Sequence, residues 1–500
     1  MDIGKTAKCL FIRTRLFPHR LLAGALKHNG QWQAFGDGTT YRELLDRCLR
    51  LAGHLRASGL GPGDRLLLDL PNGAAFIEAR LAAILSGVTV VPIPPETSAE
   101  RLGWLADSTG ARFYLGPRAT CLPGLPGITV SLLTGDQEEY RHCLARAQPL
   151  SRPPRLGADH LLSINFTSGT TGEPKGVMST ISGWGFSLYY ALLENRVPLQ
   201  PGEVFLHTIP LATAGSTLLL PAVLSGSKNL FIQDWDPDLA AQRVEAERVT
   251  RLFLTPTLLA QFMDAVRARG TDTASLKSVI YGTEDIPPAR VRKALKILGP
   301  KLQQGYGMAE ALPPVCLLHP SDHERGLRQN EDPSLLASAG RPTRAVTLRI
   351  CDAEGHPLPT GTQGSIRLKG RTVSPGYWQR PDLTAATRAN GYYISGDEGF
   401  LDAGGYLHVR GREGSVPSPW SRELRNRAES RDDVSLAWVV EARGAAILHV
   451  VPAQGRRLEE NELRDSLDRA ADGRKVHGVR VHREPPMTPS YKLDTRGEAR

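Results

Sequence analysis

Blocks with helical spacing of apolar residues alternate with short apolar runs along most of the chain. Residues 74–87, AAFIEARLAAILSG, carry the helical pattern and lead into the apolar run VTVVPIPP at residues 88–95. Later, the apolar run RLFL at residues 251–254 precedes the helical pattern TPTLLAQFMDAVRARG at residues 255–270. Strands that alternate with helices in this way are typical of α/β layers around mostly parallel sheets.

Two polar stretches rich in Pro or Gly, residues 146–160 and 326–343, are expected to be surface connections. After the second stretch, residues 347–370 predict two strands joined by a Gly/Pro turn. A small β-rich lobe is therefore expected to follow the α/β part.

A different pattern begins at Gly411. It predicts a helix near residues 422–430, strands at 436–442 and 445–453, and a second helix at 459–472. We therefore expect a large N-terminal domain, residues 1–410, and a separate small α+β domain, residues 411–500.

Composition places the chain among globular proteins. Of its 500 residues, 41% are hydrophobic and 23% are charged, and its 50 Gly and 37 Pro follow no fixed period, which excludes collagen-like and disordered classes. The net charge of +9 is not gathered into a basic stripe with interleaved aromatic residues, so no nucleic-acid partner is expected. The six cysteines form no C-x-x-C pair and are expected to be reduced and mostly buried.

No targeting or membrane segment is expected. Arg, Pro and His interrupt the apolar stretches near the N-terminus before a signal-peptide core forms, and no apolar run is long enough to span a membrane. A cytoplasmic protein with no membrane span is the resulting prediction.

The segment HLLSINFTSGTTGEPKGVM, residues 160–178, has the composition of a phosphate-binding loop. An apolar strand leads into Thr167, Ser168, Gly169, Thr170, Thr171 and Gly172, with Lys175 and Gly176 shortly after. Glycines allow backbone N–H groups to point at phosphate oxygens, hydroxyls add donors and the lysine adds positive charge. The spacing is not that of a Walker loop, because Gly follows the lysine. Taken alone, the composition also fits a flexible surface turn.

The string FTSGTTGEPKG resembles the phosphate-loop signature of the AMP-forming adenylate ligases, which include acyl-CoA synthetases, peptide-synthetase adenylation domains and luciferases. Three further segments match that superfamily in order and spacing: GYGMAE at 305–310, YYISGDEGFLDAGGYLHVRGR at 392–412 and MTPSYKLDTR at 487–496. The resemblance extends from about Thr40 to the end of the chain. It implies two α/β subdomains and the β-rich lobe in the N-terminal domain, and a mobile C-terminal domain.

The resemblance also implies an activity, in which a substrate carboxylate attacks the α-phosphorus of ATP to give an acyl-adenylate and pyrophosphate. The carboxylate is already ionised at pH 7, so the site supplies positioning and charge neutralisation rather than a general base. A thiol, either CoA or the phosphopantetheine of an acyl or peptidyl carrier protein, would then accept the acyl group.

Roles follow residue by residue from the matching motifs. The residues expected to hold the triphosphate are Thr167, Ser168, Gly169, Thr170, Thr171, Gly172 and Lys175. Glu310 is expected to bind Mg²⁺, a hard cation that prefers oxygen ligands. Tyr306 and Gln304 are expected at the adenine, Asp397 at the ribose, and Arg412 at the ribose or a phosphate. Lys492 would bridge the carboxylate and the α-phosphate, so Lys492, Lys175 and Glu310 are the expected catalytic residues.

The acid pocket is expected near Thr213, Gly282, Thr283 and Gly305. The visible contributors to it are small or apolar apart from Glu284, and Asp234 and Asp236 lie in a segment that resembles the strand-to-helix link of acyl-CoA synthetases. A fatty or aryl acid is therefore favoured over an amino acid.

Four positions depart from the family pattern. Ala309 stands where threonine is usual. The threonine hydroxyl would give the adenylate phosphate a charge-assisted hydrogen bond worth roughly 1.5–3 kcal/mol, and alanine cannot make it. Thr213 stands where acyl-CoA synthetases commonly place histidine, and His207 is interpreted as a core or surface residue. The loop after the hinge at Gly414 is several residues shorter than usual, and Tyr491 replaces the glycine before the catalytic lysine.

These departures concentrate on transfer to the thiol, and two hypotheses follow. In the preferred one, the chain is a working ligase with a C-terminal domain trimmed for one acceptor. In the alternative, it is a degenerate, non-catalytic member that binds nucleotide or acyl ligand as a regulatory or scaffold subunit.

Overall fold

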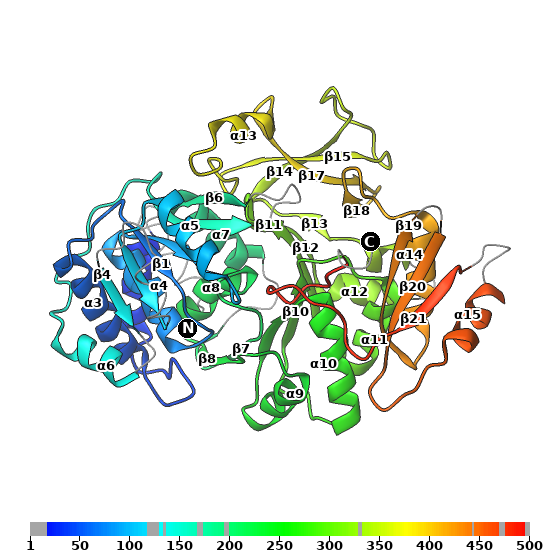
Figure 1. Cartoon of the computed structure of the whole chain (residues 1–500), viewed down its shortest axis with the longest axis horizontal. Coiled ribbons are helices and arrows are strands. Elements are labelled where there is room, and N and C mark those ends of the chain that lie inside the picture. The colour runs from blue at the N-terminus through cyan, green and yellow to red at the C-terminus, as the bar shows by residue number, and fades with distance from the viewer. Residues whose placement is uncertain are drawn as a thin grey trace.

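The computed structural model describes residues 18–117, 130–133, 137–167, 174–194, 200–328, 333–442, 445–469 and 476–495. Within these ranges the chain forms four β-sheets flanked by helices (Figure 1). Parallel strand pairs dominate the first two sheets, which confirms the α/β class predicted from the sequence.

The first sheet has the strand order β4-β3-β1-β2-β5-β6 and is parallel except for the β5–β6 pair. Its strands are β1 (Arg65–Leu68), β2 (Thr89–Pro92), β3 (Phe113–Gly116), β4 (Val130–Leu133), β5 (Leu161–Thr167) and β6 (Lys175–Thr180). The accompanying helices are α2 (Pro18–His28), α3 (Tyr41–Ala57), α4 (Ala74–Ser86), α5 (Ala99–Thr109), α6 (Gln137–Arg146) and α7 (Ile181–Glu194). Helix α4 packs against α2, α3, β1 and β2, which explains why its sequence is apolar on almost every side.

The second sheet has the order β13-β12-β11-β10-β9-β7-β8. Its strands are β7 (Val204–His207), β8 (Lys228–Phe231), β9 (Arg251–Leu254), β10 (Ser278–Gly282), β11 (Leu302–Met308), β12 (Ala311–Leu318) and β13 (Arg341–Pro342). The helices are α8 (Leu219–Ser225), α9 (Pro237–Ala246), α10 (Pro256–Arg269), α11 (Pro288–Leu298) and α12 (Pro320–Leu327), with 3₁₀ turns η2 (Ala214–Leu218) and η3 (Pro333–Ala337).

The boundaries of α10 follow from its sequence. The Thr255 side chain caps the helix by accepting from the backbone N–H of Leu258, and Pro256 occupies the first helical position, where its missing N–H costs nothing. Gly270 ends the helix at a φ of +65°, a left-handed conformation that favours glycine. The helix predicted over residues 255–270 is thus confirmed, and its first turn lies beside the site described below.

The third sheet is antiparallel and forms the β-rich lobe, with β14 (Val346–Cys351), β15 (Gly364–Gly370), β16 (Arg388–Ala389), β17 (Tyr392–Leu401), β18 (Leu407–Arg412) and the helix α13 (Pro381–Ala386). The fourth comprises β19 (Val434–Ala442), β20 (Ala445–Pro452) and β21 (Gly478–Val481), packed with α14 (Pro419–Ser430) and α15 (Glu460–Arg469). We call the part from α14 to β21 the C-terminal unit. Its helices and strands match the α+β pattern predicted after Gly411.

One expectation about connections is wrong. Residues 326–343 were predicted to be a surface link, but the described part of this stretch includes η3 and β13 and buries Leu335, Leu336 and Ala339. The two leucines pack into separate apolar clusters, Leu336 with the second sheet and Leu335 with Tyr406. The abundance of Gly, Pro and polar residues in the stretch concealed these apolar anchors.

Two smaller expectations concern cysteines and membranes. Cys48, Cys316 and Cys351 are buried free thiols and Cys143 is half-buried, as predicted, whereas Cys9 and Cys121 lie outside the described residues. In the ranges that the structure describes, none of the helices has both the length and the apolar character needed to cross a membrane.

Candidate active site

Asp397 and Arg412 face each other on neighbouring strands of the β-rich lobe. They are register partners on β17 and β18, and the Arg412 Nε lies 3.1 Å from Asp397 Oδ1. The Arg412 guanidinium also donates to the carbonyl of Ser395 at 3.0 Å, which fixes its orientation. Although Asp397 is only 8% exposed, each carboxylate oxygen can accept more than one hydrogen bond. The pair therefore offers acceptors that suit the two hydroxyls of a ribose.

Tyr306 joins this pair from the second sheet. Its hydroxyl donates to Asp397 Oδ2 at 2.6 Å, and burial together with the nearby Asp397 charge raises its pKa well above the ordinary value. Gln304 lies two residues earlier on β11, and because side chains alternate along a strand, both residues project from the same face. The structure thus brings together all four residues predicted to contact adenosine.

Glu310 lies in the turn between β11 and β12, directly after Ala309. The Tyr377 hydroxyl donates to Glu310 Oε1 at 3.0 Å, and the Ser374 backbone N–H donates to the Glu310 carbonyl at 2.8 Å. Burial and the Glu310 charge raise the pKa of Tyr377 to about 12, so it remains a donor at neutral pH. These contacts leave Glu310 Oε2 for another partner.

The residues around Glu310 suit a Mg²⁺ ion that arrives with phosphates. Within the described residues, no group of three or more His, Cys, Asp or Glu side chains is placed to hold a metal. A single carboxylate together with substrate phosphates is a common way to bind Mg²⁺, which keeps several of its waters. Glu310 therefore fits a shared site and not a cage built from protein alone.

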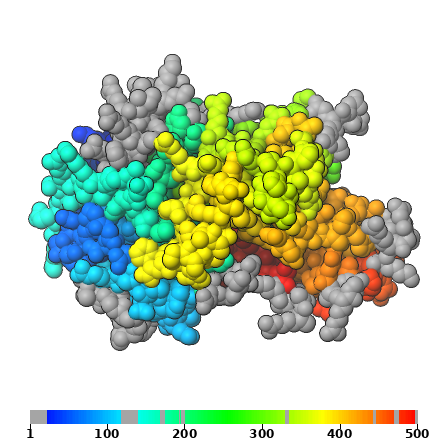
Figure 2. Space-filling model, turned by 90° about the horizontal axis from the view of Figure 1, so that it is seen from above, coloured from blue at the N-terminus to red at the C-terminus, as the bar shows by residue number. Residues whose placement is uncertain are grey.

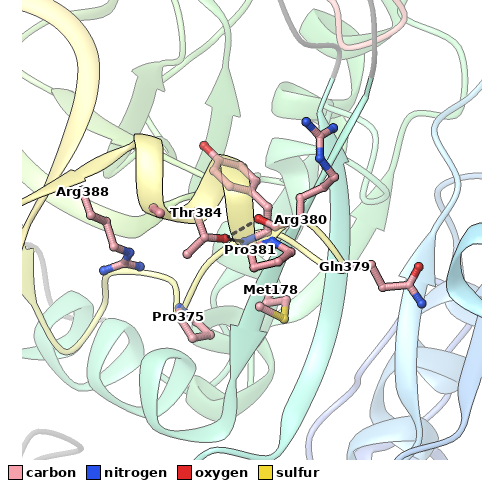
Figure 3. A pocket seen from close by; sticks show the side chains of 9 residues that line it. Met178, Pro375, Gln379, Arg380, Pro381, Thr384 and Arg388 are labelled. Carbon is pink, nitrogen blue, oxygen red and sulfur yellow. Dashed lines mark hydrogen bonds between the residues drawn. The ribbon is translucent and has the colours of Figure 1, made fainter.

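A pocket of about 450 Å³ lies beside this region and is lined by Tyr377 (Figure 3). The side chains drawn there come from β6, α13, β16 and the segment before α13, and Arg388 donates to the Ser374 carbonyl. Arg380 pairs with Asp382 at 2.9 Å. Both guanidiniums are thus engaged with the protein, so the pocket contributes a wall to the Glu310 region and no free cation.

The ends of the candidate phosphate loop are described, but its centre is not. Thr167 at the end of β5 is the register partner of Lys175 at the start of β6, and both are half-buried. Ser168, Gly169, Thr170, Thr171 and Gly172 lie outside the described residues. Their predicted role in triphosphate binding stays a prediction.

On the acid side, the structure explains the two glycines. A Cβ at Gly282 would lie 2.2 Å from the Gly305 carbonyl oxygen, so only glycine allows these parallel strands to pair this closely. A Cβ at Gly305 would meet nothing within 4 Å, which indicates open space there. Thr283 has a φ of +79°, and among the described residues its buried Oγ1 has no hydrogen-bond partner. Strain and an unpaired polar atom at one residue are typical of functional positions.

The other acid-side candidates are held by the protein itself. The Thr213 hydroxyl and backbone N–H both donate to the Pro210 carbonyl at 2.9 Å, and the Thr213 carbonyl accepts from the Ser216 hydroxyl at 3.1 Å, so the methyl group remains for a ligand. His207 is buried between Phe205 and Phe231 and bonds to Asn229 at 2.9 Å, and burial lowers its pKa to about 4. His207 is thus a core residue, as interpreted from the sequence, and does not replace the missing histidine at position 213.

The C-terminal segment, residues 486–495, returns to the second sheet. The backbone N–H of Leu493 donates to the Glu284 carboxylate, which also accepts from the N–H and hydroxyl of Thr257 at 3.0 Å. Figure 2 shows the red end of the chain recessed between the yellow β-rich lobe and the orange C-terminal unit. Glu284 therefore joins this segment to the start of α10.

Tyr491 makes a second attachment of the same segment. Its hydroxyl accepts from the Trp235 N–H at 3.2 Å and donates to the Gln233 carbonyl at 3.3 Å, while its own carbonyl accepts from Thr255 at 2.7 Å. Its φ of +58° is the conformation that favours the glycine usual here. The tyrosine thus keeps a strained backbone and gains anchoring contacts.

Lys492 is half-buried within this doubly attached turn. Burial lowers the pKa of its ammonium group, the charge of Glu284 opposes that effect, and the nearby positive Arg412 adds to it. The neighbouring residue Leu493 is bonded to the Glu284 carboxylate, so the turn that carries Lys492 is attached at the acid side of the candidate site.

The C-terminal unit is also joined to the second sheet by a buried ion pair, which we call the latch. Arg290 on α11 and Glu429 on α14 each have side chains 1% exposed and form two hydrogen bonds, one of 2.8 Å. Arg290 further donates to the Pro256 carbonyl, and Glu429 accepts from the Ala437 N–H. No motif in the sequence marked these residues.

Comparison with known protein families agrees with this geometry. The family model described as AMP-binding enzyme matches residues 24–378, well over half of the chain. The chain belongs to the AMP-binding enzyme family. This membership confirms the resemblance stated above, and the match extends over the strands that carry Thr167 and Tyr306 and over the turn with Glu310.

Individual members of the family resemble the chain along nearly all of its length. A feruloyl-CoA synthase from Amycolatopsis sp. is 31% identical, over 98% of this chain and 97% of its own. A fatty acid–[acyl-carrier-protein] ligase, ScoC of Streptomyces coeruleorubidus, is 26% identical over 86% of this chain and 85% of its own. The structure of the amide bond synthetase McbA from Marinactinospora thermotolerans is 25% identical with a TM-score of 0.79, covering 97% and 99% of the two chains. This AMP-binding enzyme thus has the adenylate-forming ligase fold.

Proposed function

We propose that this AMP-binding enzyme activates a carboxylic acid with ATP, releasing pyrophosphate, and transfers the acyl group to a thiol. The observation that carries the proposal is the attachment of the Lys492 turn by Glu284 and Tyr491. An ammonium group at this position can neutralise the charge that gathers where carboxylate and α-phosphate meet. A merely solvated lysine in a polar tail would need neither attachment.

In the proposed reaction each described group has one task. Asp397 and Arg412 orient the ribose, and Tyr306 packs on the adenine while it fixes Asp397. Lys175 and the phosphate loop hold the triphosphate. Glu310 would hold Mg²⁺, which when bound neutralises phosphate charge. Lys492 orients the acid against the α-phosphate, so that the ionised carboxylate attacks without a general base.

We further propose an aryl or fatty acid as substrate. Gly305 leaves open space on the acid side, and Glu284 is the one carboxylate in the predicted lining of the pocket. The Glu284 carboxylate is engaged by Thr257 and Leu493, so it is poorly placed to pair with an α-ammonium group. The feruloyl-CoA synthase relative supports an aryl acid, and ScoC supports a fatty acid and a carrier-protein acceptor.

A second candidate is transfer of the acyl group to an amine. The similarity to the amide bond synthetase McbA favours it, together with the short link 413–418 and the buried latch. An amine small enough to enter the candidate active site could react while the Lys492 turn stays in place. A thiol that needs a second arrangement of residues 411–500, which we propose as a separate domain, would require the latch to open.

The test is acid-dependent ATP–pyrophosphate exchange over a panel of aryl, fatty and amino acids. Exchange is expected with aryl or fatty acids and is expected to disappear in Lys492→Ala. Lys228→Ala is the matched control, because this lysine pairs with Glu247 at the edge strand β8, outside the site. Exchange that survives in Lys492→Ala would contradict the role of that lysine. No exchange with any acid, while calorimetry still detects ATP binding, would favour the non-catalytic alternative.

A further inference from the structure

A buried chain of hydrogen bonds leads from α12 to the side chain of Gln304. The Tyr281 hydroxyl lies 2.8 Å from His323 Nε2, and His323 Nδ1 lies 2.8 Å from the His319 carbonyl oxygen. On the other side, the same hydroxyl lies 3.4 Å from the Gln304 carboxamide atom that is assigned as Oε1. Tyr281 and His323 are both fully buried, and Tyr281 is the register partner of Gln304 on β10 and β11.

The positions of the protons in this chain follow from chemistry. A carbonyl oxygen only accepts, so His323 Nδ1 must carry the proton that is shared with His319. Burial lowers the pKa of His323 to about 4, so the imidazole is neutral and its other nitrogen, Nε2, is an acceptor. Burial also raises the pKa of Tyr281, which keeps its single proton and donates it to His323 Nε2.

Tyr281 consequently has only an oxygen lone pair left for Gln304. The carboxamide group that faces it must then be the NH₂, because an amide oxygen there would meet an acceptor without a proton. Oxygen and nitrogen of an amide have nearly the same shape, so the hydrogen-bond network decides between the two orientations. The Gln304 carbonyl oxygen is therefore turned away from Tyr281, toward the accessible side of this half-buried residue.

We propose that Tyr281 and His323 are positioning residues that make this enzyme select a 6-aminopurine nucleotide over a 6-oxopurine one, through the orientation of Gln304. The inference rests on the proposed function, which places the adenine at Gln304 and Tyr306. A fixed carbonyl oxygen accepts from the 6-amino group of adenine. The same oxygen would meet the 6-oxo group of hypoxanthine, acceptor against acceptor, and a site built to hydrogen-bond one group discriminates strongly against its mismatch.

The test compares ATP with inosine triphosphate, which carries oxygen in place of the 6-amino group. The wild-type chain is expected to prefer ATP in kcat/KM of the exchange reaction and in Kd measured by calorimetry. In Tyr281→Phe the amide can rotate and present its NH₂ to the 6-oxo group. The preference for ATP should then fall about three- to tenfold, the range of one hydrogen bond between neutral groups, mainly because inosine triphosphate binds better.

Two comparisons separate this role from a structural one. Tyr41 in α3 also has a buried hydroxyl, which donates to the Ser227 carbonyl at 2.7 Å. Its loss in Tyr41→Phe should leave the ATP preference unchanged. In a Gln304→Leu background, Tyr281→Phe should have no further effect on the preference, because it acts through the amide. Loss of stability alone would change the values for both nucleotides together.

Three results would overturn the inference: a wild-type chain without preference for ATP, a folded Tyr281→Phe variant with the wild-type preference, or an equal change in Tyr41→Phe. Failure of the proposed function looks different, since the wild-type chain would then show no acid-dependent exchange with ATP. A chain that binds ATP without exchange still decides the inference through the ratio of the two Kd values.

Discussion

Ala309 departs from the threonine of the family pattern, and a single substitution can measure the effect of this change on the rate of adenylation. It lies half-buried in the turn before Glu310, where the family pattern has a threonine hydroxyl near the adenylate phosphate. We expect Ala309→Thr to raise kcat of ATP–pyrophosphate exchange by about ten- to a hundredfold, the range of one hydrogen bond to a charged group. Ala309→Val has nearly the same shape without the hydroxyl and should not raise it. An equal gain in both variants would mean that bulk, and not the hydroxyl, matters here.

The Lys492 ammonium predicts a pH dependence of the same reaction. Its pKa is lowered mainly by burial, so it loses its proton, and the exchange rate falls, at a lower pH than for an ordinary lysine near 10.5. The negative charge of Glu284 raises this pKa, so Glu284→Gln should move the alkaline limb of the pH profile further down. Glutamine still accepts from the Leu493 N–H, which keeps the turn attached.

Lys492→Arg is the matched control for that profile, because a guanidinium stays protonated throughout the range. Its rate is expected to be lower, but without the alkaline limb. A limb that persists in Lys492→Arg, or that stays in place in Glu284→Gln, would assign the titration to another group.

At the residue scale, the sequence singled out the side chains that we expect to face the ligands and missed the buried residues that contact them. Asp397, Tyr306 and Glu310 stand in motifs with fixed spacing, so their neighbourhood was predictable. Tyr377 and Tyr281 carry no such signal, because their contacts with Glu310 and Gln304 join residues separated by 67 and 23 positions. Only the pairing of strands and the packing of the β-rich lobe bring these partners together.

At the scale of elements, the latch predicts how helices α11 and α14 are held together. Removing one member of a buried ion pair leaves the other charged and unpaired, so Glu429→Ala should cost about 3–5 kcal/mol of unfolding free energy. Replacing both members, Arg290→Met with Glu429→Leu, should cost far less, since well-packed apolar side chains often substitute for a buried pair. Denaturant unfolding of the full chain measures both.

The exposed pair between Arg427 and Glu423 on α14 is the control for this experiment. Its two side chains are 28% and 48% exposed, so Glu423→Ala should cost at most about 0.5 kcal/mol. A similar loss in Glu423→Ala and Glu429→Ala would mean that helix α14 itself is weakened and that the latch contributes little.

Elements were predicted better than the contacts between them. The sequence patterns predicted α4 and α10 because apolar spacing and capping residues are local signals. The predicted ends of both helices agree with the structure within a few residues. The stretch 326–343 was interpreted wrongly because its two buried leucines are few against many polar neighbours. The latch could not be predicted from the sequence for a different reason. Arg290 and Glu429 are 139 positions apart, and each resembles an ordinary helix surface residue.

At the scale of the whole molecule, several contacts favour one arrangement of the C-terminal unit. The latch fixes the C-terminal unit against α11, and the Glu284 attachment and the Tyr491 anchor fix the turn that carries Lys492 at the candidate active site. Gly414, with a φ of +75°, gives the short link between β18 and α14 a residue that tolerates other backbone angles. The molecule thus combines a strongly held arrangement with a link that permits another one.

This combination predicts how the acceptor can be identified. Glu429→Gln keeps the shape and the acceptor for the Ala437 N–H but removes the charge that pairs with Arg290, so the latch weakens. If the acceptor is a thiol that needs a second arrangement, acyl transfer from preformed acyl-adenylate should become several-fold faster while exchange becomes slower. Transfer to an amine in the held arrangement should slow in step with exchange.

Glu423→Gln on the same helix should change neither rate. Single-turnover transfer to CoA, a carrier protein and a panel of amines measures the difference, and a thiol transfer that slows together with exchange would contradict the need for a second arrangement.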